Sequence, residues 1–589
     1  MQNKLPSTLP VGVCVAPVPP PNRARTVNYP RYIHEILRHA GVCYQDVAPE
    51  LLPDTLDHLR LLVTVGELEL EDSVKSRVAA WVEAGGAWLA IGSVCGMPDV
   101  FGAQLKTPSY AGWGVGTGTL GEGYLHAASP THPIVAGLRI PLHFFNGIPA
   151  AAGNTHVLAT VSDAHQRPTT RTGVTEKNVG RGRAVLVAPD VTGAVVRIQQ
   201  GTAITRDGVP SDDGAAPRCD GILKSDDGAV LDWHFDRQPV ENVAGLQAFL
   251  EPIADQWREL VLRAVFYLAE RQQVPLPVLW LYPRDLPAIG HISHDTDGND
   301  PGRAKLLLQT LEKADIRSTW CTIPPGYAQE TMEGIRARGH ELAMHYDAIS
   351  EGRVWNESAF DQQWGDLTAL FGGVAPTTNK NHYLRWEGDT EFFQWCGRRG
   401  IQLDQSKGPS KPGQAGFLFG TCHPHLPVAP NGSSLDVLEL PTLTQDLVVF
   451  VPPAFLSPLL EAALRHHGIL HLLFHPAHID KPGVEEALLE SVEAARRAGM
   501  EWWTAEQINL WERARRTVEW TGRTTSGGVT FQASQPLPEA TLLWLSNEVR
   551  AATINGRSVT PTSVVRWGFQ FSGAQLDVAP GIPYSFAFD

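Results

Sequence analysis

Short apolar segments of strand length alternate with amphipathic segments of helix length in two separate stretches of this 589-residue chain. In the first stretch, strands are predicted over 11–16, 61–65, 87–91 and 184–188, and helices over 29–40 and 71–84. Such alternation is typical of a parallel sheet covered by helices on both faces. We therefore predict a doubly wound α/β domain over residues 1–200.

The second stretch contains five short segments that are rich in acidic residues and histidine or lie at the ends of predicted strands. They are 291–298 (His-Ile-Ser-His-Asp-Thr-Asp-Gly), 339–345 (Gly-His-Glu-Leu-Ala-Met-His), 376–388, 400–406 and, after a strand over 469–474, 475–478 (His-Pro-Ala-His). Between the first two segments, the pattern predicts a helix over 304–314, a strand over 317–322 and a helix over 328–338. Because the carboxyl ends of parallel strands lie on the binding face of an α/β sheet or barrel, we expect these polar side chains to meet there.

One apparent metal motif in this stretch is excluded by its spacing. His340 and His345 are five residues apart, which places them about 140° apart around a helix. A zinc-binding helix needs two histidines four residues apart on one face. The segment 341–345 is therefore predicted to be a strand.

In their order, the five segments resemble the motifs of NodB-like polysaccharide deacetylases, and the resemblance covers residues 276–510. It implies a NodB-type (β/α) distorted barrel and a hydrolase in which a divalent metal activates water while side chains transfer protons. The resemblance implies that Asp295 is the general base and His475 the general acid. It implies that Asp297 and His345 bind the metal.

Three further residues are expected in the catalytic machinery on the same resemblance. Asp404 matches the fourth motif, and the arginine of the third motif is matched either by Lys380 or by Arg385. His382, Trp386 and His423 are expected to contact the substrate. Trp386 is the one of 17 tryptophans placed beside a motif, where its ring could stack on a sugar.

The sequence departs from the family at two ligand positions. Thr296 separates the two aspartates, and Ile349 occupies the position of the second histidine of the second motif. The third ligand is therefore expected from His382, Asp347 or His294, in that order. A set of aspartate and histidine ligands suits Zn²⁺, with Ni, Co or Mn as alternatives.

The regions outside the second stretch are predicted to be accessory. Residues 1–200 resemble a degenerate class I glutamine-amidotransferase-like domain, with Cys95 in Gly-Ser-Val-Cys-Gly displaced by one from a nucleophile position, so we expect no glutaminase activity. Residues 201–275 are predicted to be linker loops, including Asp-Asp-Gly at 212–214, and a helix over 253–271. A strand over 278–282 opens the deacetylase-like domain 276–515, and 516–589 is predicted to be a β-sandwich with strands 529–533, 540–545, 552–554 and 584–588.

Composition excludes several classes of partner. A net charge of −15 without a basic cluster argues against nucleic acid or an anionic membrane. No apolar run reaches the ~20 residues that a membrane helix needs, and no secretory signal is evident, so a cytoplasmic location is expected. The seven cysteines, at 14, 43, 95, 219, 321, 396 and 422, form no Cys-x-x-Cys pair and are expected to be reduced.

These observations predict a metal-dependent hydrolase that removes acetyl groups from N- or O-acetylated carbohydrate, and the amidotransferase-like region suggests a homo-oligomer. Two alternatives remain. Ile349 favours an inactive carbohydrate-binding or scaffold protein on a deacetylase fold. The other alternative is a hydrolase that acts on non-sugar, cyclic amides, because fold alone does not select the substrate.

Overall fold

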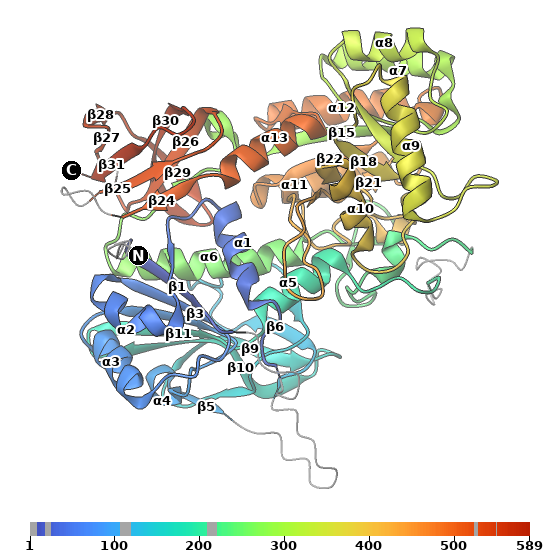
Figure 1. The fold of residues 1–589 in the computed structure, drawn as a ribbon. Coiled ribbons are helices and arrows are strands. Elements are labelled where there is room, and N and C mark those ends of the chain that lie inside the picture. The colour runs from blue at the N-terminus through green and yellow to red at the C-terminus, as the bar shows by residue number, and fades with distance from the viewer. Residues whose placement is uncertain are drawn as a thin grey trace. The chain divides into compact units, whose positions relative to one another are not determined.

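The computed structural model describes residues 9–17, 25–105, 119–208, 221–522, 528–548 and 550–588. The described part of the chain is a mixed α/β protein whose contacts divide it into two compact units (Figure 1). Unit 1 combines Met1–Val195, Gln256–Asp285 and Arg513–Asp589, and unit 2 combines Val196–Asp255 and Leu286–Glu512. None of the helices in these described residues is long and apolar enough to cross a membrane. The predicted turn at 212–214 and Cys219 lie outside the described residues.

The larger sheet of unit 1 has nine strands. From edge to edge they are β2 (Gln45–Asp46), β1 (Val11–Val15), β3 (Leu61–Val65), β4 (Ala87–Ile91), β11 (Gly182–Val187), β10 (Pro168–Val179), β9 (His156–Asp163), β6 (Gly123–Ala127) and β7 (Leu142–Phe144). The pairs from β2 to β11 are parallel and the remaining pairs are antiparallel. The central strands β3 and β4 are fully buried, as their continuous apolar runs predicted. A short sheet pairs β5 (Ala103–Leu105) with β8 (Ala150–Ala152).

The helices of this region are α1 (Ile33–His39), α2 (Leu52–Thr55), α3 (Asp72–Glu83), α4 (Pro98–Phe101), α5 (Val191–Gln200) and α6 (Ile253–Arg271). The predicted helix over 29–40 begins late, because Tyr29 has left-handed backbone and Pro30–Tyr32 forms a 3-10 turn before α1. The helix predicted over 253–271 is confirmed as α6.

The C-terminal region forms two antiparallel sheets. One contains β14 (Pro277–Leu279), β26 (Leu537–Leu545), β30 (Phe569–Val578) and β29 (Thr562–Arg566), and the other contains β24 (Glu519–Thr521), β25 (Val529–Gln532), β31 (Tyr584–Phe588), β27 (Ala552–Ile554) and β28 (Arg557–Val559). The buried rings of Trp544 and Phe586 connect the two sheets, with centroids 5.1 Å apart. The prediction that 278–282 opens the deacetylase-like sheet was wrong, because β14 pairs with β26 instead.

Unit 2 is built on a parallel sheet. Its strands are, in order, β20 (Leu438–Glu439), β19 (Leu403–Asp404), β18 (Thr378–Asn381), β17 (Glu341–Tyr346), β16 (Thr319–Thr322), β15 (Ile289–Asp295), β22 (Ile469–Leu473) and β21 (Thr444–Gln445), and β23 (Glu501–Trp502) also pairs with β15. All of these pairs are parallel. The carboxyl ends of the strands therefore share one edge, where the predicted motifs lie. A two-stranded ribbon pairs β12 (Gln238–Pro239) with β13 (Gln247–Ala248).

The helices of unit 2 lie between or after these strands in the sequence, and the last of them continues into unit 1. They are α7 (Pro301–Ala314), α8 (Gln329–Ala337), α9 (Glu357–Leu370), α10 (Glu391–Arg399), α11 (Leu456–Arg465), α12 (Val484–Arg497) and α13 (Ala505–Arg516). Helix α7 begins three residues before the predicted 304, because the Asp300 side chain caps it by accepting from Gly302 N and Arg303 N and Pro301 opens its first turn. The strand prediction for 341–345 is confirmed by β17, so His345 lies at the carboxyl end of a strand.

Candidate active site

Two aspartates mark the carboxyl end of the central strand β15. Asp295 is its last residue, and Asp297 follows after Thr296. The Thr296 side chain is buried, where its hydroxyl donates to Asn299 Oδ1 at 2.9 Å and accepts from Ile323 N at 3.1 Å. Because Thr296 is anchored in this way, both aspartates lie within 4 Å of His345 although the pair is split.

Asp297, His345 and His382 form a cluster that could hold a metal ion. Asp297 Oδ1 lies 3.3 Å from His345 Nε2 and 3.7 Å from His382 Nε2. One ligand atom from each residue lies within 4.8 Å of the others. The first of the three predicted sources of a third ligand, His382, is therefore the one that lies with the two predicted metal ligands.

The chemistry of this donor set fits a divalent cation. His345 Nε2 and Asp297 Oδ1 are buried and have no hydrogen-bond partner among the described residues. The other nitrogen of each histidine is held by an oxygen: His345 Nδ1 lies 2.9 Å from Lys380 O, and His382 Nδ1 lies 3.0 Å from Asp347 Oδ1. Metal-binding histidines are commonly oriented in this manner. Burial opposes ionisation of Asp297, but the neighbouring histidines outweigh it and hold its pKa below the ordinary value.

The two other predicted sources of the third ligand lie elsewhere. Asp347 orients His382 and also accepts from the backbone N–H groups of Ile349 and Ser350, at 3.0 and 3.2 Å. His294 is fully buried, with Nδ1 2.7 Å from Phe474 O, and is not part of the cluster.

Asp295 lies beside a buried lysine. Lys380 Nζ is 3.5 Å from Asp295 Oδ1 and donates to Ser293 Oγ at 2.6 Å. Ser293 Oγ also lies 2.9 Å from His471 Nε2. Burial lowers the pKa of His471 well below its ordinary value, so this imidazole is neutral. The structure thus brings Lys380, and not Arg385, next to the predicted base.

His475 lies on the other side of the two aspartates. Its Nε2 is 4.0 Å from Asp295 Oδ2 and 3.8 Å from Asp297 Oδ2, and its Nδ1 is 2.5 Å from Asp446 Oδ2. Burial alone would lower the pKa of His475, but Asp446 and the two aspartates outweigh it and raise the pKa to about 9. A raised pKa favours the protonated imidazole, which is the form that a general acid needs. His478 Nδ1 also lies 3.0 Å from Asp446 Oδ2.

The prediction that Asp404 belongs to the catalytic machinery is not supported by its position. Asp404 is buried in β19, where it accepts from Asn379 Nδ2 at 2.7 Å and Ser406 Oγ at 2.8 Å. Burial raises its pKa. The carboxylate that contacts His475 is Asp446, which sequence reasoning missed because β21 before it is only two residues long.

Three other predicted residues are also not brought to the cluster. Arg385 binds Glu387. Trp386 is fully buried among the rings of the core, so its face is not open to a sugar, and the predicted stacking role is wrong. His423 is buried with its Nε2 2.9 Å from His466 O and belongs to a separate group with Asp255 and Cys422.

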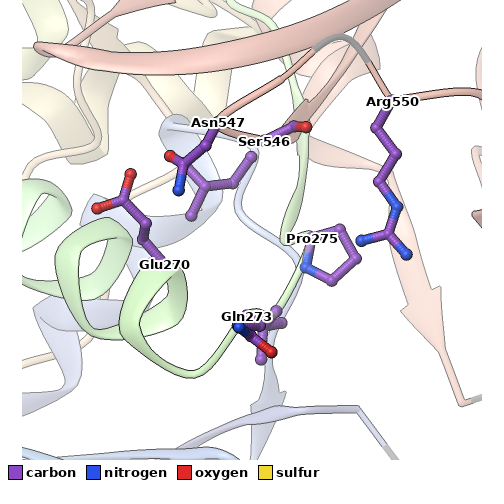
Figure 2. A pocket seen from close by; sticks show the side chains of 8 residues that line it. Glu270, Gln273, Pro275, Ser546, Asn547 and Arg550 are labelled. Carbon is purple, nitrogen blue, oxygen red and sulfur yellow. The ribbon is translucent and has the colours of Figure 1, made fainter.

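Unit 1 offers no comparable cluster in its described residues. Cys95 is fully buried, and burial raises its pKa to about 11, so the thiol remains neutral. A pocket of about 150 Å³ lies between the end of α6 and the segment after β26, and Glu270 and Arg550 line its opposite sides (Figure 2). None of its eight lining residues is a histidine, cysteine or aspartate, so it lacks the donors found in unit 2.

No family model and no curated protein matches this chain. Among solved structures, a putative polysaccharide deacetylase from Mycobacterium smegmatis is 19% identical, over 41% of this chain and 95% of that one, with a TM-score of 0.32. A family 4 acetyl xylan esterase from Clostridium thermocellum, in complex with a cobalt ion, is 12% identical over 37% and 89%, with a TM-score of 0.24. A β-galactosidase from Bacillus circulans sp. alkalophilus is 15% identical over 31% of this chain but only 29% of that one, with a TM-score of 0.23.

Proposed function

We propose that this protein is a metal-dependent hydrolase that removes acetyl groups from N- or O-acetylated carbohydrate. The observation that carries the proposal is the cluster of Asp297, His345 and His382, in which two buried ligand atoms lack a hydrogen-bond partner and face each other at 3.3 Å. Asp295 and His475 lie within 4 Å of this cluster. The order of the motifs that supply these residues, which resembles NodB-like deacetylases, supports the substrate class.

The metal would be held by Asp297, His345 and His382, a donor set that suits Zn²⁺. A cation held there would polarise the acyl carbonyl and lower the pKa of a water molecule. The exposed fraction of the Asp297 side chain is 34%, whereas His345 is fully buried, so the cluster is open to solvent at the aspartate.

The remaining residues are proposed to move protons. Asp295 takes a proton from the attacking water, and Lys380, 3.5 Å away, holds this carboxylate in place. His475 carries a proton at neutral pH and gives it to the departing amine or alcohol. Asp446 fixes the imidazole through Nδ1, which leaves Nε2 directed to the aspartates.

Acetate release from acetylated chito- and xylo-oligosaccharides tests the proposal. Full-length protein is stripped with a chelator and then reconstituted with Zn²⁺, Co²⁺, Ni²⁺ or Mn²⁺. We expect activity only after reconstitution, and we expect Asp295→Asn to abolish it while the metal content is unchanged. Asp361→Asn, on the surface of α9, serves as the matched control.

The same experiment separates the two rival functions. A protein that retains no divalent metal after reconstitution and releases no acetate would be a binding or scaffold protein. A protein that binds metal and hydrolyses small cyclic amides, but leaves every acetylated glycan intact, would instead be a non-sugar amidohydrolase.

A further inference from the structure

Two exposed apolar residues of unit 2 have a backbone conformation that their residue types disfavour. Tyr383 has a φ of 59° and is 57% exposed, and Val448 has a φ of 81° and is 39% exposed. Left-handed backbone strains any residue with a Cβ, and a β-branched residue is a marked outlier there. Within the described ranges, these are the only two large exposed apolar residues with such backbone.

Both residues adjoin the candidate active site. Tyr383 follows His382, and the two rings meet edge to face with centroids 5.3 Å apart. Val448 lies two residues after Asp446, which binds His475. In the order of the sheet, β18 leads to Tyr383 and β21 leads to Val448, and these strands lie on opposite sides of β15. The two residues therefore follow strands on either side of β15, one next to His382 and the other close after Asp446.

Strained backbone and exposed apolar surface both oppose stability, and such residues gather at sites that bind ligands. A tyrosine ring offers a rigid apolar face with a polar tip, which suits the apolar face and hydroxyl rim of a pyranose ring. On the basis of the proposed function, we propose that Tyr383 stacks on a pyranose unit of the glycan substrate and that Val448 contacts the substrate from the opposite side. Tyr383 thus takes the role that the sequence assigned to the buried Trp386.

Glycine substitutions separate this role from folding. Glycine accepts left-handed backbone, so Tyr383→Gly and Val448→Gly remove the side chain and the strain together. We expect both variants to keep or raise the thermal unfolding midpoint. We expect Tyr383→Gly to weaken binding of tetra-N-acetylchitotetraose by about tenfold, whereas Tyr383→Phe retains the ring and binds as the wild type does. Val374→Ala, which shortens a residue that is 63% exposed elsewhere in unit 2, is the control and should have no effect.

Calorimetric binding in an Asp295→Asn background, beside acetate release by the parent enzyme, distinguishes this inference from the proposed function. If acetate release depends on metal and Asp295 but Tyr383→Gly binds the tetrasaccharide normally, the stacking role is overturned and the hydrolase stands. If no acetate is released but binding falls about tenfold in Tyr383→Gly, the stacking role stands and the hydrolase fails. Wild-type protein that binds neither chitotetraose nor acetylated xylotetraose overturns the stacking role.

Discussion

Replacing Asp347 with alanine is expected to weaken Zn²⁺ binding by about 10- to 100-fold, the usual effect of removing the partner that orients a metal-binding histidine. Asp347 Oδ1 lies 3.0 Å from His382 Nδ1 and accepts from the N–H groups of Ile349 and Ser350, at 3.0 and 3.2 Å. Alanine removes all three contacts. The His382 imidazole is then no longer oriented, and the loop at Ile349 and Ser350 loses its hydrogen-bond acceptor. The loss corresponds to about 1.4 to 2.7 kcal/mol of binding free energy.

Asparagine at this position is the informative comparison. Asp347→Asn keeps an oxygen that can accept from the loop but removes the charge, so its Zn²⁺ affinity should fall between the wild type and Asp347→Ala. The free energy of unfolding of the metal-free protein should fall by about 1.5 to 3 kcal/mol in Asp347→Ala, because the N–H groups of Ile349 and Ser350 lose a charged acceptor. In Asp347→Asn most of this loss should be absent.

The affinity is measured by competition with a fluorescent zinc chelator at fixed pH, on full-length protein. Ile349→Ala is the matched control, since Ile349 donates to Asp347 through its backbone N–H, which alanine retains. A zinc affinity of Asp347→Ala within about twofold of the wild type would exclude an orienting role for Asp347, since the expected loss is at least about tenfold. His382 would then not be a ligand held by Asp347.

Three further results are expected. Asp446→Asn should lower turnover by about 10²- to 10⁴-fold at unchanged zinc content, because His475 loses the carboxylate that orients it. If steady-state kinetics show no loss of turnover, His475 is not the general acid. Trp386→Ala should lower the free energy of unfolding, measured with urea, by about 3 to 5 kcal/mol, because the ring is fully buried; a small loss of stability with a large loss of glycan affinity would restore the stacking role. Glu176 in unit 1 has its pKa lowered from 4.5 to about 2, because its hydrogen bonds outweigh the effect of burial. The ionised Glu176 carboxylate thus stabilises the fold above pH 4.5, and this stabilisation of about 3 kcal/mol is lost as the pH falls towards 2. Urea unfolding across this pH range should show the loss in the wild type but not in Glu176→Gln.

The regular elements could be predicted from the sequence where their periodicity was continuous. Strands β3, β4, β27 and β31 and helix α6 match the predicted bounds, because each is an unbroken run with a clear end signal. The strand β14 was assigned to the wrong sheet. Its apolar run shows that it is buried but not which strand it pairs with, and its partner β26 is more than 250 residues away in the sequence.

The site was predictable only in part, and for physical reasons. Asp295, Asp297, His345 and His475 follow recognisable strands, so their convergence could be expected from topology. Asp446 follows a strand of two residues, which is too short to give a periodic signal. His382, the first of the three predicted sources of the third ligand, lies in the turn after β18 and does join the cluster.

Strand position alone also did not distinguish buried from accessible aromatic residues. Trp386 and Tyr383 are three residues apart beside the same motif, yet the first is fully buried and the second is 57% exposed. The difference arises because Trp386 packs against Phe392 and Phe393, which lie on α10.

Anomalous scattering from a crystal of the zinc-loaded protein, recorded on both sides of the zinc absorption edge, shows directly whether Asp297, His345 and His382 hold the metal. We expect one strong zinc peak about 2.0 to 2.2 Å from Asp297, His345 Nε2 and His382 Nε2. Asp297→Asn crystals treated in the same way provide the control and should show this peak weakened or lost. A zinc peak at Asp446, His475 and His478 instead, or no peak in unit 2 at saturating zinc, would contradict the assignment of Asp297, His345 and His382 as the metal ligands.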